Sequence, residues 1–120
     1  MPKVKKTAVK VKNGRDILDN WYEIGDMFEY KGKRYTATKE EEKRVYRDSR
    51  ERDEVSQTIL TLESERGSIF VAFIYDANEL YYIRILNTEQ KAIDHVRDAW
   101  MRFQKRFQGQ FRRALMRKGW

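Results

Sequence analysis

Apolar and polar side chains alternate early in this chain, which is the pattern of a strand with one buried face. Residues 21–30 alternate in this way, and their large side chains fall mostly on one face. The pair Lys31-Gly32 follows, and it suits a tight turn because glycine adopts positive φ at little cost. Residues 33–38 then read as a second strand. The pattern predicts a β-hairpin over residues 21–38.

Three further strands are predicted in the second half of the chain. Residues 55–63 are rich in β-branched and polar side chains, and residues 69–75 are apolar on both faces, which indicates a central strand. Residues 80–86 supply the last strand. Turn-forming residues separate them at 64–68 and 76–79. The three strands are expected to form an antiparallel meander.

The period then changes from two residues to three or four, which predicts an amphipathic helix over residues 88–118. Asn87 with Gln90 three positions later matches a capping box at its start. Basic residues fall on the opposite face, and no proline interrupts the segment. The predicted apolar stripe consists of Ile93, Val96, Trp100, Phe103, Phe107, Phe111 and Leu115.

Residues 1–13 have too few large apolar groups to offset the entropy of ordering them. The segment is therefore interpreted as a flexible basic N-terminal arm. Valines at positions 4, 9 and 11 favour extended structure, so an edge strand is the alternative.

Residues 39–54 form a highly charged excursion, with 13 charged side chains in 16 positions. Glu40 and Arg44 form an acid-first pair at the i,i+4 spacing of a helix. There is no apolar stripe to bury. The segment is either an exposed helix or a mobile excursion between strands.

Together these elements predict an α+β fold with an antiparallel sheet of about five strands, hairpin plus meander, packed against one long C-terminal amphipathic helix. A chain of 120 residues has room for one core, so residues 14–120 are expected to form a single domain after the arm. The apolar stripe of the predicted helix is longer than a seven-residue strand that it would cover. Residues 107–120 would then project, which leaves their apolar side chains for a homodimer or another partner.

The net charge of +7 is concentrated at the two ends of the chain. Residues 1–12 carry +5 and residues 97–120 carry +7, whereas residues 13–96 carry −5. Such asymmetry favours a directed surface for an anionic partner, either nucleic acid or an acidic protein surface. The alternative is that the basic tails only maintain solubility.

Composition also sets limits on the class of protein. With no cysteine there is no disulfide, no thiolate nucleophile and no cysteine-ligated zinc, and a reducing cytoplasm fits this composition. No run of 18 apolar residues is present, so no membrane span is expected, and the N-terminus lacks the apolar core of a secretory signal. No glycine-rich phosphate loop occurs, and no cofactor is expected.

No catalytic residue is predicted, and the chain is not expected to be an enzyme. His95 lies between Asp94 and Asp98 on the polar side of the predicted helix, which favours a solvent-exposed histidine. A Glu-x-Lys triplet begins at Glu29, with Asp26 nearby, as in some metal-dependent nucleases. These two acids are three apart on a strand and would point to opposite faces. A carboxylate-metal nuclease site is left as an alternative.

The candidate nucleic-acid residues are basic and aromatic. Lysine and arginine side chains match the charge and geometry of phosphate, and exposed aromatic rings stack on bases. The predicted phosphate contacts are Lys3, Lys5, Lys6, Lys10, Lys12, Arg102, Lys105, Arg106, Arg112, Arg113, Arg117 and Lys118. The predicted stacking residues are Tyr22, Tyr30, Tyr35 and Tyr81. The alternative for each tyrosine is a place in the core with its hydroxyl at the rim.

The sequence thus predicts a small basic protein that binds nucleic acid, single-stranded or with low specificity, through arm and helix for phosphates and sheet tyrosines for bases. The alternative is a small protein-interaction factor that docks on a larger nucleic-acid-processing machine and modulates or inhibits it. Its docking elements would be the charged excursion and the projecting helix.

Overall fold

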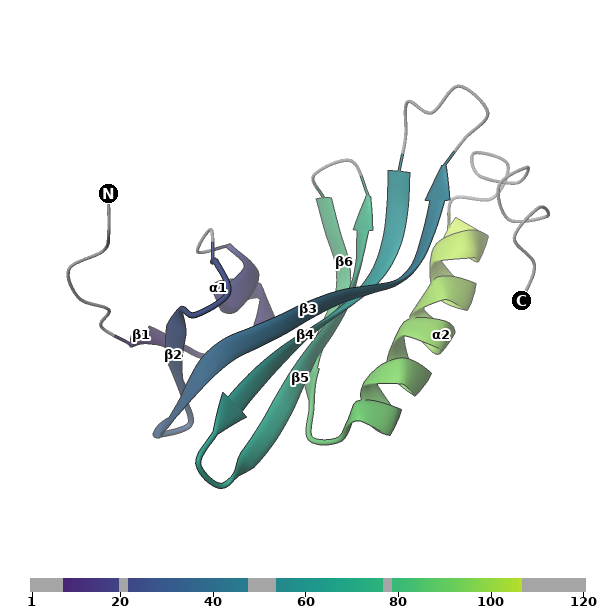
Figure 1. The fold of residues 1–120 in the computed structure, drawn as a ribbon. Coiled ribbons are helices and arrows are strands. Elements are labelled where there is room, and N and C mark those ends of the chain that lie inside the picture. The colour runs from purple at the N-terminus through teal and green to yellow at the C-terminus, as the bar shows by residue number, and fades with distance from the viewer. Residues whose placement is uncertain (1–7, 20–21, 48–53, 77–78, 107–120) are drawn as a thin grey trace.

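The structure is a computed structural model that describes residues 8–19, 22–47, 54–76 and 79–106. One six-stranded sheet and two helices make up these residues (Figure 1). The strands are β1 (Val9–Val11), β2 (Met27–Tyr30), β3 (Lys33–Arg47), β4 (Glu54–Ser64), β5 (Gly67–Asp76) and β6 (Glu79–Leu86), and the helices are α1 (Gly14–Leu18) and α2 (Glu89–Arg106).

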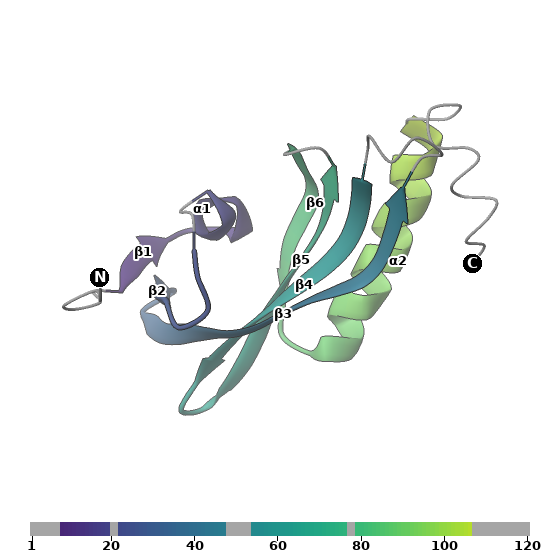
Figure 2. The same ribbon diagram turned by 45° about the horizontal axis from the view of Figure 1, so that its top comes forward.

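The α+β class with a C-terminal helix on a sheet is confirmed. The sheet, however, is mixed and has six strands, in the order β1-β2-β3-β4-β5-β6, rather than about five antiparallel ones. Four of the five pairings are antiparallel, and β1 pairs with β2 in parallel, with Val9 opposite Phe28. The sheet curls, so that β1 and α1 lie over one face and α2 lies over the other (Figures 1 and 2).

Both interpretations of the charged segment are wrong for residues 39–47, which form neither a helix nor a loop. They continue β3 to a length of 15 residues and pair with β4 up to Arg47 opposite Glu54. The backbone hydrogen bonds offered by β4 outweigh the weak helical preference of surface ion pairs. Charge is tolerated because the side chains alternate between two open faces, with irregularities in register after Ala37 and Glu42. Residues 48–53 lie outside the described residues.

The predicted hairpin forms, but its first strand is shorter than expected. Lys31 and Gly32 have φ of 52° and 79°, the left-handed values that a two-residue turn between twisted strands requires. Residues 22–26 form a loop instead of a strand. In it the Gly25 N–H donates to the Ala37 carbonyl (2.7 Å).

The N-terminal segment is an edge strand over residues 9–11, as the alternative proposed, and residues 1–7 lie outside the described residues. Helix α1, which follows, was not predicted. The Asn13 side chain accepts a hydrogen bond from the Asp16 N–H (2.9 Å), and the Asp16 carboxylate accepts one from the Lys12 N–H (2.8 Å). Gly14 packs closely against β6, because a Cβ there would lie 2.5 Å from Cγ2 of Ile83.

The apolar stripe of α2 is confirmed over the described residues: Val96, Trp100 and Phe103 are buried against β4 and β5. The predicted capping box is wrong, because Thr88 and not Asn87 accepts the hydrogen bond from the Lys91 N–H (3.1 Å). Phe107, Phe111 and Leu115, with the rest of the predicted projection, lie outside the described residues. No helix within the described residues is long and apolar enough to cross a membrane.

Gln57 is a buried polar residue on the α2 side of β4. Its side-chain amide has no hydrogen-bond partner among the described residues, although the side chain is fully buried. A buried amide without a partner costs about 1–3 kcal/mol. Gln57→Met, which keeps the length of the side chain, is expected to raise the free energy of unfolding by about 1–2 kcal/mol in urea denaturation. The control Gln90→Met, at an exposed position, should change it by less than about 0.5 kcal/mol. A loss of stability in Gln57→Met would show that the amide is hydrogen-bonded in solution.

Candidate functional site

The predicted phosphate-binding residues do not form one surface in the described part of the chain. Lys10 and Lys12 are exposed beside β1, whereas Arg102 and Lys105 are exposed on α2, which packs on β5 and β6 on the other side of the molecule (Figure 1). Arg106 ends α2, and its side chain lies outside the described part of the structure. The remaining predicted phosphate-binding residues also lie outside the described residues: Lys3, Lys5, Lys6, Arg112, Arg113, Arg117 and Lys118.

The exposed side of α2 carries both signs of charge. Its described basic residues are Lys91, Arg97, Arg102 and Lys105, and its acids are Glu89, Asp94 and Asp98. An ion pair joins Arg97 to Asp94 at 3.9 Å. Over residues 89–105 the helix is therefore a mixed surface and not a continuous basic one.

The four predicted stacking tyrosines lie in four different environments. Tyr35 is 7% exposed and belongs to the core, so a base cannot reach its ring in this structure. The ring of Tyr81 packs edge-on against Phe103, with 5.4 Å between ring centroids. Tyr22 lines a cavity together with Glu40. The half-buried ring of Tyr30 lies 5.3 Å from the Lys31 ammonium.

His95 is not the solvent-exposed residue that its neighbours predicted. It is half-buried, and its Nε2 lies 2.6 Å from the carbonyl oxygen of Tyr82. A carbonyl only accepts hydrogen bonds, so Nε2 carries the proton and donates. Tyr82 has φ of 55°, a strained value for a bulky residue, at an irregularity in the β5–β6 register. The histidine therefore ties α2 to an irregular strand.

The turns at one end of the sheet bring together cations that are far apart in the sequence. Lys31, Lys33 and Arg34 come from the β2–β3 turn and the start of β3, and Arg66 comes from the β4–β5 turn. A cleft of about 330 Å³ separates the turns, lined by Lys33, Arg34, Ser64, Glu65 and Arg66. The parallel pairing of Val11 with Tyr30 adds β1 to this end. We call the following exposed residues the basic end: Lys10, Lys12, Lys31, Lys33, Arg34 and Arg66.

Sequence reasoning identified Lys10, Lys12 and Tyr30 at this end but missed the turn cations. The turn cations could not be recognised from local sequence, because their proximity depends on which turns the strand register places side by side. Four described carboxylates lie in the elements of this end and reduce its positive charge without cancelling it: Asp16, Glu29, Glu63 and Glu65.

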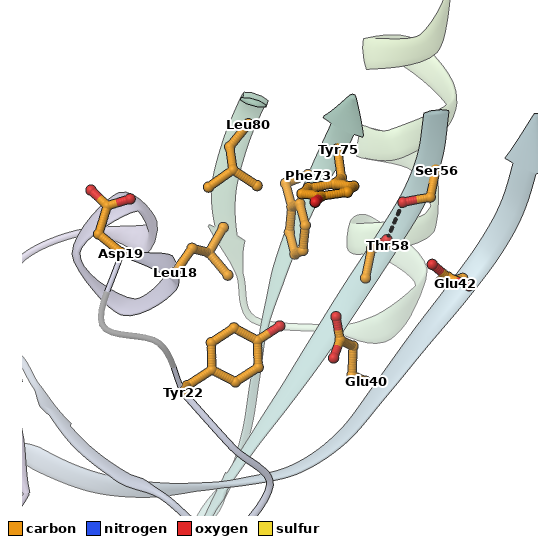
Figure 3. A pocket seen from close by; sticks show the side chains of 10 residues that line it. All are labelled: Leu18, Asp19, Tyr22, Glu40, Glu42, Ser56, Thr58, Phe73, Tyr75 and Leu80. Atoms are coloured by element: carbon orange, nitrogen blue, oxygen red, sulfur yellow. Dashed lines mark hydrogen bonds between the residues drawn. The ribbon is translucent and has the colours of Figure 1, made fainter. Parts of the chain in front are cut away.

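On the sheet face opposite α2, a cavity of about 460 Å³ opens between α1 and the far half of β3 (Figure 3). Strand geometry assigns its walls, because residues two apart on a strand point to the same face. Glu40 and Glu42 therefore face it from β3, and Phe73 and Tyr75 face it from β5. Tyr22 approaches from the loop after α1.

The remaining walls combine apolar and hydroxyl groups. Leu18 and Leu80 lie on one side of Phe73, and Ser56 and Thr58 lie on the other (Figure 3). Asp19 adds a third carboxylate. Within the described ranges, no lysine, arginine or histidine lines the cavity. It is thus an acidic and aromatic site in a basic protein.

Burial raises the pKa of the Tyr22 hydroxyl above its ordinary value, and the charge and hydrogen bond of Glu40 raise it further. Tyr22 therefore stays neutral at physiological pH, and its hydroxyl remains a hydrogen-bond donor. On the opposite face, the Lys43 ammonium lies 3.1 Å from Oε1 of Glu41 and lowers the pKa of that carboxyl. The two faces of β3 thus differ, with the cavity side carrying the unneutralised carboxylates.

The metal-site alternative gains no support from the part of the chain that the structure describes. No group of three or more His, Asp or Glu side chains there is placed to hold a metal ion. The Asp26 carboxylate accepts a hydrogen bond from the Glu23 N–H (2.8 Å), which closes the local turn.

No family model, no curated protein and no solved structure matches this chain. Two candidate sites therefore rest on geometry alone: the basic end and the acidic cavity. Their charges are opposite, so they would attract different ligands.

Proposed function

We propose that this protein binds nucleic acid with little sequence specificity, and that the basic end is its phosphate-binding surface. The observation that supports this most directly is the gathering of Lys33, Arg34 and Arg66 around one cleft, with Lys31 in the adjoining β2–β3 turn. The proposal keeps the predicted class of partner. It moves the main binding surface from α2 to the turns of the sheet.

The cations of the basic end are available to an outside anion. All six are exposed, and none forms an ion pair with another described residue. Unpaired cations concentrate counter-ions, and a nucleic-acid backbone displaces them with a gain in entropy. The cleft places positive charge on both of its sides, which suits a strand of phosphates passing between the turns.

Tyr30 provides an aromatic group beside these cations. It is half-buried, so its ring is held by the sheet while part of it remains accessible. Stacking on an aromatic ring does not distinguish the bases strongly, which agrees with low specificity. Lys3, Lys5 and Lys6 precede β1 in the sequence and are candidates for binding further phosphates.

The protein-docking alternative has weaker support. One of its two docking elements, the charged excursion, is over residues 39–47 a strand paired with β4. The other, the projecting helix, lies outside the described residues.

Salt dependence of binding tests the proposal. The variant Lys31→Gln, Lys33→Gln, Arg34→Gln, Arg66→Gln removes four charges from exposed side chains, so folding should be retained. For each phosphate of a single strand that the variant no longer neutralises, the slope of log affinity against log salt should flatten by about 0.7. The same relation predicts that affinity falls about a hundredfold or more at 0.1 M salt. Fluorescence anisotropy of a labelled 20-nucleotide single strand measures both.

A matched control removes four charges from α2: Lys91→Gln, Arg97→Gln, Arg102→Gln, Lys105→Gln. The net charge falls equally in the two variants, so a difference between them reports position. The control should keep most of the wild-type slope. Equal slopes for the two variants would show that binding depends only on net charge and not on the basic end. Failure of the wild-type protein to bind the single strand at low salt would refute nucleic-acid binding as its function.

A further inference from the structure

The acidic cavity combines three aromatic rings with carboxylates in one hollow. Tyr22, Phe73 and Tyr75 contribute the rings, from a loop and from β5, and Glu40 and Glu42 contribute carboxylates from β3 (Figure 3). Aromatic faces carry partial negative charge, and they attract cations that water solvates weakly. This group of side chains favours a cation and disfavours phosphate, so it has no role in the nucleic-acid binding proposed above.

The size and polarity of the cavity narrow the class of cation. A volume of about 460 Å³ lies in the range of small-molecule sites, and Leu18, Phe73 and Leu80 make part of the wall apolar. A metal ion or bare ammonium would gain little from such a wall. An alkylated ammonium group has an apolar surface that suits the wall of Leu18, Phe73 and Leu80, and a positive charge that suits the carboxylates.

Glu42 is available to such a charge. It is exposed at the cavity rim and has no ion pair or hydrogen bond with another described residue. The Glu40 carboxylate points into the cavity near the Tyr22 hydroxyl (Figure 3). A carboxylate has two oxygens with several acceptor sites, so Glu40 can accept from a ligand as well as from a neighbouring hydroxyl.

A buried pair of hydroxyl groups supplies independent support for a ligand. Ser56 and Thr58 are 1% and 2% exposed, line the cavity, and lie 2.9 Å apart through Oγ and Oγ1. One of the two hydroxyl groups donates its proton to this hydrogen bond. The proton of the other hydroxyl group then has no acceptor among the described residues. A buried donor of this kind needs an oxygen from water or a ligand. It fits a ligand that carries an oxygen near its cation.

We propose that this cavity binds a methylated alkylammonium group with a neighbouring oxygen, of the size of choline or of a trimethylated lysine side chain. The half-buried rings of Tyr22 and Tyr75 would contact the methyl groups, and the buried ring of Phe73 would form the inner wall of the site. The carboxylates of Glu40 and Glu42 would compensate the charge, and the Ser56–Thr58 pair would donate to the oxygen.

Isosteric probes test the requirement for charge. Choline and 3,3-dimethyl-1-butanol share shape and hydroxyl group, and differ in the positive nitrogen. Choline is expected to bind the 120-residue protein at least tenfold more tightly than the neutral alcohol does, as followed by titration of backbone NMR shifts. A second arm uses N-acetyl-Nε-trimethyllysine amide, and tighter binding of this compound than of choline would assign the source to a modified protein. Equal binding of choline and its neutral isostere, or binding of no probe, would overturn the proposal.

Substitutions locate the site. Glu40→Gln with Glu42→Gln keeps the size of two exposed side chains, and it should abolish the preference for choline over the neutral probe. Glu41→Gln, one position away on the other face of β3, is the matched control and should leave that preference unchanged. If the control variant lost the preference as the double variant did, the charge of β3 as a whole and not the cavity would be responsible. Thermal melting checks that each variant is folded.

Discussion

Trp100→Ala is expected to lower the free energy of unfolding by about 3–5 kcal/mol, because it removes a large buried side chain and leaves a cavity. Trp100 is 0% exposed and stacks on Phe103 with 5.4 Å between ring centroids. The two rings belong to a cluster with Val55 and Ile74, which joins α2 to β4 and β5. Urea denaturation should show a lower midpoint with an unchanged slope.

The neighbouring substitution Met101→Ala serves as control. Met101 is 55% exposed on the same turn of α2, and its removal should change the free energy by less than about 0.5 kcal/mol. If Trp100→Ala unfolded at the wild-type midpoint, the packing of α2 on the sheet would be wrong.

Phe28→Ala is expected to cost a similar amount, about 3–5 kcal/mol, on the opposite face of the sheet. Phe28 is buried in β2, in a cluster with Ile17 of α1 and Leu60 and Leu62 of β4. This cluster holds the N-terminal elements against the sheet, and its partly buried members include the cavity residues Leu18 and Tyr22. The destabilisation should therefore appear in urea denaturation and also as larger exchange rates of backbone amides in α1.

Ile24→Ala provides the comparison for Phe28. Ile24 is 53% exposed in the loop before β2, so its substitution should shift the free energy by less than about 0.5 kcal/mol. Faster exchange in α1 of the Phe28→Ala variant without a change in global stability would mean that β1, α1 and β2 unfold as a separate unit.

Local patterns predicted several elements correctly. The run of residues 69–75 that is apolar on both faces, the Lys31-Gly32 turn and the helical stripe around Trp100 all reflect burial or backbone freedom, which a few neighbouring residues determine. The helix α1 was missed even though Asn13 and Asp16 have capping spacing, because five residues are too few for a periodic signal.

The candidate sites were predictable only in part. Lys10, Lys12 and Tyr30 were identified from charge and aromaticity, whereas Lys33, Arg34 and Arg66 lie at the same end only because two turns meet there. Tyr35 was assigned to an open face, and its strand in fact turns it into the core. Period-two patterns identify two faces of a strand but do not say which face is covered.

The α+β class, the three strands of the meander, the hairpin turn and the apolar face of α2 were all predictable from the sequence, since each depends on interactions among near neighbours. Long-range contacts, which the sequence pattern does not reveal, extend β3 over residues 39–47, pair β1 with the sheet in parallel, and place Glu40 and Glu42 opposite three aromatic rings. The physical reason is that backbone pairing with β4 overrides the weak local preference of a charged segment. Long-range register then sets which charges and rings become neighbours.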